Sequence, residues 1–372
     1  MKPISHLFAL SVLSFSLLSM PATAAGPEKV ATMDRGLWPT AIVNKQEFNR
    51  ASAAEILVFS QLLDQIDIDS EANIQGFTGI ENINAEEVYR WRDRTRQQLL
   101  RNYQLACADC GVTDWQSLVS QPLSQTQADN TAWLTASQKF HQYYLYEQVR
   151  LAALFPRITS EISLLDPDKE INGTEFPDLH FLLTYDDGPA ADATRDGKVV
   201  NPTAMLVESL NRFGLHGQFF VLGERLVSQK PAINTYDGQC LGSHGQQHKS
   251  HQKWQQWAES LDATTQALVP YQSGPYWLRP PYGQRHQELL DHVAAEGGKV
   301  MLWNIDSQDW NKKLTNDEVR DRVKTLMLLW RHGIILYHDV HPRALDNLAA
   351  LNQFAQQTGL TFVDCHQLTI QP

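Results

Sequence analysis

Apolar residues in the first half of the chain recur every three or four positions, which is the spacing of one helix face. The clearest stripes consist of Ile56, Phe59, Leu63 and Ile66, then Val88, Trp91 and Leu99, and then Trp133, Ala136, Phe140, Tyr144 and Leu151. Stripes of this kind normally pack into a core. The pattern predicts a mainly helical N-terminal region over residues 26–175.

From about Leu179 onward, short apolar runs alternate with helical stretches. The predicted strands cover residues 179–185, 217–222, 277–279, 300–305 and 334–337. The predicted helices cover residues 202–213, between Pro202 and Gly214, and about 315–331, between Thr315 and Gly333. This alternation predicts an α/β fold with a parallel sheet, either open or closed into a barrel. In both cases functional residues gather at the carboxyl ends of the strands.

The first 25 residues predict a secretory signal peptide. Lys2 precedes an apolar stretch over residues 7–20, and an Ala-x-Ala site follows at residues 22–24. The stretch is shorter than the roughly 20 apolar residues that span a bilayer, although a retained anchor is the alternative. No later stretch is apolar enough to cross a membrane. We therefore expect a periplasmic or secreted protein without a membrane span after signal removal.

Length and charge narrow the classes of function. A chain of 372 residues has room for more than one domain. The formal net charge is −11 and the sequence shows no basic cluster, so a nucleic-acid partner is not expected. The acidic balance also disfavours a strongly anionic substrate, whereas a neutral or cationic substrate fits.

The chain has four cysteines, which would meet an oxidising compartment after export. Cys107 and Cys110 are separated by two residues, a spacing shared by zinc half-sites, redox pairs and small disulfides. A second zinc pair and a thioredoxin-like context are both missing from the sequence nearby, so a local disulfide is the prediction. Cys240 and Cys365 are expected to be buried thiols.

Five short polar motifs lie where predicted strands give way to loops. They are Asp186-Asp187, His244 with His248, Arg279 with Tyr282, Asp306 with Asp309 and Trp310, and Leu336 with His338. Adjacent carboxylates resist burial unless a cation or a reaction requires them, and two imidazoles four residues apart can share a metal. Taken singly, the first motif also fits an acidic turn and the second a surface helix.

In this order the five motifs resemble those of the polysaccharide deacetylases, the NodB-type carbohydrate esterases of family 4. The resemblance runs from about Leu179 to the C-terminus. It implies a catalytic domain over residues 176–372, built as a distorted, incomplete (β/α)7-type barrel.

The resemblance also implies one divalent metal ion, held by Asp187, His244 and His248. We expect zinc, with cobalt, nickel or iron as alternatives, because two imidazoles and a carboxylate suit all of them. Asp186 would then be the general base that takes a proton from the attacking water. His251 lies outside the motif and is expected to be solvated.

The remaining motif residues receive roles from the same resemblance. Arg279 would orient the base, and the backbone N–H of Tyr282 would donate to the oxyanion. His338 would be the general acid. The expected pairings are Asp309 with Arg279 and Asp306 with His338.

Trp310 and Leu336 would wall the acetyl pocket. The predicted function is that of a metal-dependent hydrolase of non-peptide C–N bonds, which removes N-acetyl groups from an N-acetylglucosamine-containing polysaccharide or oligosaccharide. The alternatives are deacylation of another sugar, at an acetyl ester or a formamide, and a non-catalytic carbohydrate-binding protein.

We expect the helical region to extend the substrate groove beside the barrel mouth. The polar insertion at residues 189–201 should overhang the metal site.

Overall fold

The computed structural model describes residues 30–123, 131–195, 197–271 and 275–370. The predicted signal peptide, residues 1–25, lies outside them. Among the described residues, none of the helices combines the length and the hydropathy that a bilayer span requires.

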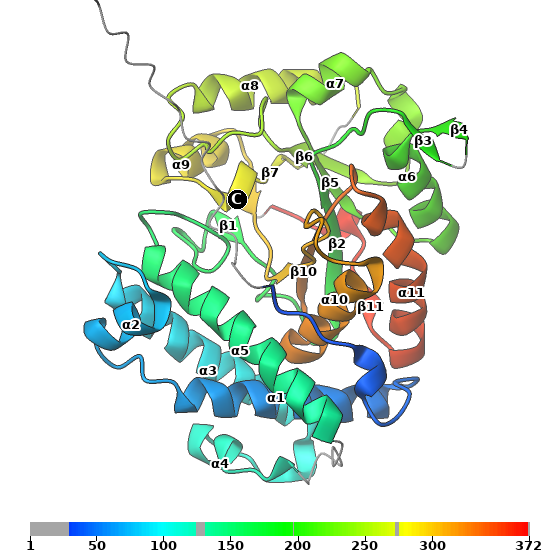
Figure 1. Ribbon diagram of the computed structural model, residues 1–372. Coiled ribbons are helices and arrows are strands. Elements are labelled where there is room, and N and C mark those ends of the chain that lie inside the picture. The colour runs from blue at the N-terminus through cyan, green and yellow to red at the C-terminus, as the bar shows by residue number, and fades with distance from the viewer. Residues whose placement is uncertain (1–29, 124–130, 196, 272–274, 371–372) are drawn as a thin grey trace, which may run out of the picture.

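The N-terminal part of the chain is helical, as the apolar stripes predicted (Figure 1). Its helices are α1 (Lys45–Gln65), α2 (Glu71–Thr78), α3 (Ala85–Ala106), α4 (Trp115–Val119) and α5 (Thr131–Leu154). The side chains of Asn44 and Asn84 accept hydrogen bonds from the first turns of α1 and α3, which fixes where these helices begin. Phe59, Trp91 and Phe140 from the three stripes are buried in one core.

The second part is a curled parallel sheet surrounded by helices (Figure 1). Its strands are β1 (Glu170–Ile171), β2 (His180–Asp186), β5 (Gln218–Val221), β6 (Cys240–Ser243), β7 (Trp277–Leu278), β8 (Lys299–Met301), β9 (Ile305–Asp306), β10 (Gly333–His338) and β11 (Thr361–Phe362). The strand order is β1-β8-β7-β6-β5-β2-β10-β9, and β11 pairs with β2. In the part of the chain that the structure describes, β1 and β9 are edges that do not pair with each other. The predicted distorted, incomplete (β/α)7-type barrel is therefore confirmed.

Helices follow the strands around the outside of the sheet. They are α6 (Pro202–Phe213), α7 (Gly223–Gln229), α8 (Trp257–Leu268), α9 (Gln287–Ala295), α10 (Asn316–Trp330) and α11 (Pro342–Thr358). The predicted helix starts are confirmed by their chemistry. Pro202 occupies the first turn of α6, and Thr315 and Glu318 form a reciprocal capping box at α10.

The predicted strand over residues 300–305 is two strands, β8 and β9. The side chain of Asn304 explains the break, because its Oδ1 accepts from the N–H of Ile334 and its Nδ2 donates to the carbonyl of His332. The residues after β8 thereby leave that strand and cross to the opposite edge of the open sheet, where β9 pairs with β10.

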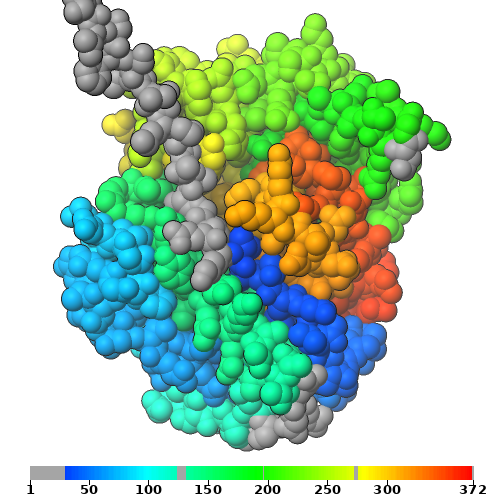
Figure 2. All heavy atoms as spheres, viewed as in Figure 1, coloured from blue at the N-terminus to red at the C-terminus, as the bar shows by residue number. Residues whose placement is uncertain are grey.

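The helical region packs on the barrel through α10, and one hydrophobic cluster runs through both parts. Buried polar contacts cross the same boundary: Ser52 donates to the carbonyl of Leu328, and Asn102 donates to the carbonyls of Leu329 and Trp330. In Figure 2 the N-terminal part, coloured blue to teal, lies directly against the barrel, coloured green to red, on the face in view. The division at residue 175 stays a prediction, and β1 joins the sheet from before it.

Both cysteine pairs form disulfides. The Cys107–Cys110 bond confirms the prediction, whereas the prediction of free thiols for Cys240 and Cys365 is wrong. Cys240 opens β6, and Cys365 follows β11, where its N–H donates to the carbonyl of His216 just before β5. The sheet therefore brings together two cysteines separated by 125 positions.

The insertion at residues 189–201 contains an exposed hairpin, β3 (Ala193–Arg195) and β4 (Lys198–Val200). Arg195 lies 3.0 Å from Asp346 of α11. None of the described residues of the insertion lines the cavity that holds the motif residues. The expectation that it overhangs that cavity is therefore not met.

Candidate active site

The motif residues meet at the carboxyl ends of the central strands. Asp186 ends β2 and His338 ends β10, and the two are paired in the sheet register. The histidine loop follows β6 and the Arg279 loop follows β7. Parallel strands point their carboxyl ends to one rim, which explains why motifs far apart in the sequence share one site.

Asp187, His244 and His248 form a group with metal-ligating geometry. Oδ1 of Asp187 lies 3.5 Å from Nε2 of His244 and 3.5 Å from Nε2 of His248. Ligands bound tetrahedrally at about 2.1 Å from zinc stand roughly 3.4 Å apart. Nδ1 of His244 lies 2.6 Å from the carbonyl oxygen of Arg279. A proton on that nitrogen leaves Nε2 as an acceptor, as a metal ligand requires.

The electrostatics of Asp187 also suit a cation. Its Oδ1 is buried and makes no hydrogen bond within the described residues. Burial alone would raise the pKa of this carboxyl group, but the nearby imidazoles of His244, His338 and His248 hold the pKa well below its usual range. An ionised, buried oxygen without a hydrogen bond is an expensive arrangement unless a positive charge occupies the space beside it. The three residues therefore fit a divalent ion.

Asp186 is fixed by Arg279, which is fully buried. Nη1 of Arg279 donates to Oδ1 of Asp186 at 2.9 Å and to Oγ1 of Thr184 at 2.7 Å. Its Nε and Nη2 donate to the carbonyls of Met301 and Leu302. The guanidinium group is held on every edge, so it keeps the neighbouring carboxylate in one orientation.

His338 is paired with Asp309, and the predicted pairings are wrong. Nδ1 of His338 lies 2.7 Å from Oδ1 of Asp309, whose Oδ2 accepts the backbone N–H of His338 at 2.9 Å. Burial would lower the pKa of His338, but the charge and hydrogen bond of Asp309 raise it to about 10. Arg279 has Asp186 as its carboxylate partner instead.

Asp306 does not contact His338 through a hydrogen bond. Its Oδ1 accepts the backbone N–H of Gln308 at 2.8 Å, and its Oδ2 accepts the side-chain amide of Gln308 at 2.6 Å. These bonds turn the chain after β9, with Gln308 at φ 60°, so that Asp309 rather than Asp306 reaches His338. Asp306 lies at the border of the site.

These residues line one cavity of about 340 Å³. Its walls include Tyr282, Leu336 and Trp310. That Trp310 and Leu336 enclose an acetyl group stays a prediction. The Tyr282 ring stands edge-on to His248, with 4.4 Å between centroids. Asp187 and Tyr282 have left-handed backbones, with φ of 75° and 60°. Such strain in non-glycine residues is typical of functional sites.

His251, predicted to be solvated, is fully buried. Its Nε2 lies 3.0 Å from Oγ of Ser260 and its Nδ1 2.9 Å from the carbonyl of Lys249. Both ring nitrogens therefore have protein partners, and His251 supports the loop that carries His244 and His248.

The cavity also has walls that the motifs did not indicate. Glu147 and Leu151 come from α5, and Glu161 comes from the loop after it. One signal in the sequence pointed to Glu147: it falls on the same helix face as Phe140 and Tyr144 of the third apolar stripe. A carboxylate on such a face has to border something polar.

Comparison with known proteins agrees with this geometry. Residues 174–301 match the family model described as polysaccharide deacetylase. The matched segment carries six of the motif residues placed in the cavity or beside it: Asp186, Asp187, His244, His248, Arg279 and Tyr282. Over this segment the chain is similar to the polysaccharide deacetylase family.

The relatives that this chain resembles are named for related polymers. Chitin deacetylase 1 of Saccharomyces cerevisiae is 29% identical over 49% of this chain and 59% of its own length. A peptidoglycan-N-acetylglucosamine deacetylase of Bacillus cereus is 27% identical over 59% of this chain and 79% of its own. A solved family 4 carbohydrate esterase from Streptomyces lividans is 25% identical, with a TM-score of 0.43, over 49% of this chain and 91% of that one. This chain thus spans little more than half of the yeast relative.

Proposed function

We propose that the protein is a metal-dependent hydrolase that removes N-acetyl groups from an N-acetylglucosamine-containing polysaccharide or oligosaccharide. The observation that carries the proposal is the convergence of three groups on one cavity: the cation site at Asp187, the Asp186–Arg279 pair and the His338–Asp309 pair. Relatives named for chitin, peptidoglycan and chitooligosaccharides support the substrate class.

Asp187, His244 and His248 would hold one divalent ion, for which zinc is the first candidate. Bound there, the ion would polarise the acetamide carbonyl and make a water molecule more acidic. Oδ1 of Asp187 and the two Nε2 atoms lie within 4.8 Å of one another and would be the ligand atoms. Nδ1 of His244, bonded to the carbonyl of Arg279, fixes the ring that presents Nε2.

Asp186 is the proposed general base. Its Oδ1 is engaged by Arg279, so Oδ2 is the oxygen that accepts a proton from the attacking water. Oδ2 lies 3.9 Å from Nε2 of His244, at the edge of the cation site. Arg279 keeps the carboxyl group in one orientation through the hydrogen bond to Oδ1.

His338 is the proposed general acid, and its Nε2 delivers a proton to the leaving amine. Asp309 holds the Nδ1 proton and keeps the imidazole protonated. The backbone N–H of Tyr282 would donate to the oxyanion. Trp310 and Leu336 would enclose the acetyl methyl group, because both line the same cavity.

We also propose that the protein works in the periplasm or outside the cell. Two observations support this location. The N-terminal sequence has the form of a signal peptide, and all four cysteines are paired in disulfides, which persist in oxidising compartments.

Acetate release from chitin oligomers, peptidoglycan and poly-N-acetylglucosamine tests the activity. Asp186→Asn should retain the bound metal and lose about 100-fold or more in kcat, as expected for removal of a general base. Asp187→Asn should lower the metal content instead. Metal loss in Asp186→Asn with retention in Asp187→Asn would reverse the assignment, and sugar binding without acetate release in the metal-loaded wild type would favour the non-catalytic alternative.

A further inference from the structure

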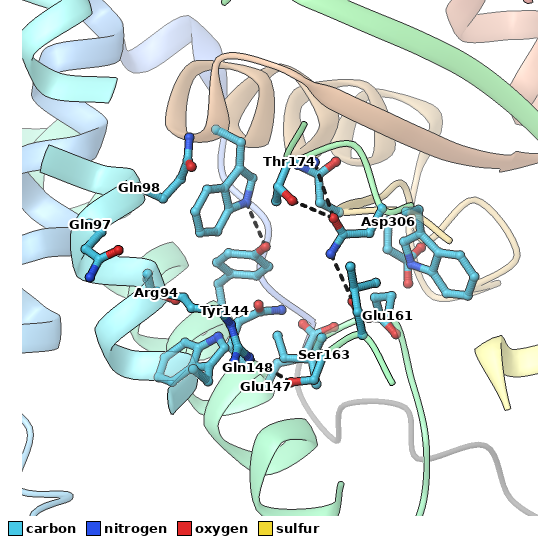
Figure 3. Close-up of a pocket in the computed structure, with 18 of the residues that line it drawn as sticks. Arg94, Gln97, Gln98, Tyr144, Glu147, Gln148, Glu161, Ser163, Thr174 and Asp306 are labelled. Atoms are coloured by element: carbon cyan, nitrogen blue, oxygen red, sulfur yellow. Dashed lines mark hydrogen bonds between the residues drawn. The ribbon is translucent and has the colours of Figure 1, made fainter. Parts of the chain in front are cut away.

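A second cavity, of about 360 Å³, lies where the barrel stays open. Asn172 and Thr174 follow the edge strand β1. At the other edge, Asn304 precedes β9 and Asp306 is its last residue. Helices α3 and α5 of the N-terminal region cover the opening from the other side. We call this space the seam cavity; Figure 3 shows its α3 side with Gln97 and Gln98 and, opposite, Glu161 and Asp306.

The seam cavity adjoins the catalytic cavity directly. Four residues line both: Glu147, Glu161, Trp303 and Asp306. A linear polymer with one residue at the cation site therefore has room for another residue beyond this shared border, since cavities of a few hundred Å³ accept small ligands.

The shared border carries polar atoms that the protein leaves without hydrogen bonds. Glu147 and Trp303 are each only 6% exposed. Oε2 of Glu147 and Nε1 of Trp303 make no hydrogen bond within the described residues. The nearest cation, Nη2 of Arg322, is 3.6 Å from Oε2 of Glu147 and also lacks a hydrogen bond. Buried polar atoms of this kind call for a ligand or a water molecule that satisfies them.

The border is also short of positive charge. Three carboxyl groups line this border, those of Glu147, Glu161 and Asp306. Arg322 forms an ion pair with Glu147, and Arg150 and Arg285 offset the charge of the two glutamates only in part. Burial and, to a smaller extent, repulsion from Asp306 raise the pKa of Glu147 to about 7 and that of Glu161 to about 8. Arg94 does not relieve this, because it donates to Glu87 and Ser163. A ligand with an ammonium group would therefore be favoured here.

The rest of the wall suits a sugar ring. Trp91, Tyr144 and Trp330 supply aromatic surface, and Gln97 and Gln148 supply amide groups. Aromatic faces with a few polar groups that fix orientation are the usual composition of a small-ligand site.

We propose that the seam cavity binds a glucosamine residue, with its free amine among Glu147, Glu161 and Asp306, next to the N-acetylated residue at the cation site. This inference rests on the proposed function. Hydrolysis of an acetamide consumes one water and gives acetate and an amine, so each reaction creates the group that the seam cavity binds. The preferred substrate is then a partly deacetylated chain.

Binding of a glucosamine tetramer, measured by calorimetry at neutral pH, tests this without relying on catalysis. The wild type should bind it, and Glu161→Gln should weaken binding by about tenfold or more, the usual effect of losing a charged hydrogen bond. Glu147→Gln should act in the same direction. Glu208→Gln, at an exposed ion pair on α6, is the matched control and should bind like wild type. Equal affinity in wild type and Glu161→Gln would overturn the proposal.

Turnover gives the second test. A tetramer with one glucosamine beside an N-acetylglucosamine should show a higher kcat/KM than the fully acetylated tetramer, and Glu161→Gln should abolish this preference. Acetate release without any preference would overturn the seam proposal and leave the proposed function intact. If glucosamine binding depends on Glu161 but no substrate releases acetate, the proposed function is overturned and the seam proposal stands.

Discussion

Asp309→Asn is the most informative single change, because the structure assigns to Asp309 the pairing with His338 that sequence reasoning gave to Asp306. The variant removes the negative charge at Nδ1 of His338 and leaves a side chain of nearly the same size. Asp309 is what raises the pKa of His338 to about 10 against the effect of burial. Without it the pKa should fall to the ordinary value of about 6.5 or lower.

The size of the effect follows from the protonated fraction of the proposed acid. With a pKa near 10, His338 is almost fully protonated at pH 8. With a pKa of 6.5, only about 3% is protonated at pH 8 and about three quarters at pH 6. The variant should therefore lose roughly 30-fold in kcat/KM at pH 8 but little at pH 6 from this cause. A metal ion nearby would lower both pKa values, whereas their difference depends on Asp309.

The assay is acetate release from an N-acetylglucosamine oligomer between pH 5 and 10, with NMR titration of the His338 ring as a readout independent of activity. Asp317→Asn, at an exposed ion pair on α10, is the control and should match wild type, whereas Asp306→Asn tests the alternative pairing of His338. An Asp309→Asn profile parallel to wild type at every pH would refute the reasoning, as would a shift confined to Asp306→Asn.

The same pair affects stability in a defined direction. The pKa of His338 in the folded protein is above the value of about 6.5 expected when unfolded. Its contribution to the free energy of unfolding is therefore fully present below pH 6.5 or so and is lost as the pH rises toward about 10. The difference in melting temperature between wild type and Asp309→Asn should shrink over that interval.

Three further outcomes are expected. Replacing Cys240 and Cys365 by serine should lower the free energy of unfolding by about 5 kcal/mol in the chain-entropy model, and replacing Cys107 and Cys110 by under about 2 kcal/mol. The difference arises because the paired cysteines are 125 and 3 positions apart in the sequence. Equal shifts in the denaturant midpoint would contradict this. Thr315→Ala should destabilise the fold by about 1 kcal/mol through loss of the α10 cap, measured in the same unfolding experiment. Chelation should abolish acetate release and added zinc or cobalt should restore it, so full activity in a metal-free preparation would contradict the proposed cofactor.

Much of the fold could be predicted because its elements begin and end with local chemistry. Pro202 and Gly214 bracket α6, and Thr315 caps α10, signals that need no tertiary information. The prediction of one strand over residues 300–305 was wrong, because β8 and β9 form one continuous apolar run in the sequence. The break between them depends on the bonds that the Asn304 side chain makes to β10 and the residue before it, which no local pattern contains.

The candidate site shows the same division. Which residue types gather at the strand ends could be predicted, since each motif follows an apolar run. Which carboxylate meets His338 could not, because Asp306 and Asp309 are only three positions apart. The turn at Gln308, held by the side chain of Asp306, decides it. The Cys240–Cys365 disulfide could not be predicted for a similar reason. It forms because the fold places β6 and the turn after β11 next to each other beside β5.

The role of the helical region follows from the open barrel rather than from its own sequence. A sheet whose edges β1 and β9 do not meet leaves unpaired backbone groups and an apolar interior at the opening. Helices α3 and α5 cover this opening, and Glu147 on α5 lines both cavities. The third apolar stripe is therefore mostly core, as expected, but its one carboxylate faces the border of the site. The same helices therefore complete the fold and line the two cavities. Single substitutions at the shared border separate the two roles, whereas removal of the region would disturb both.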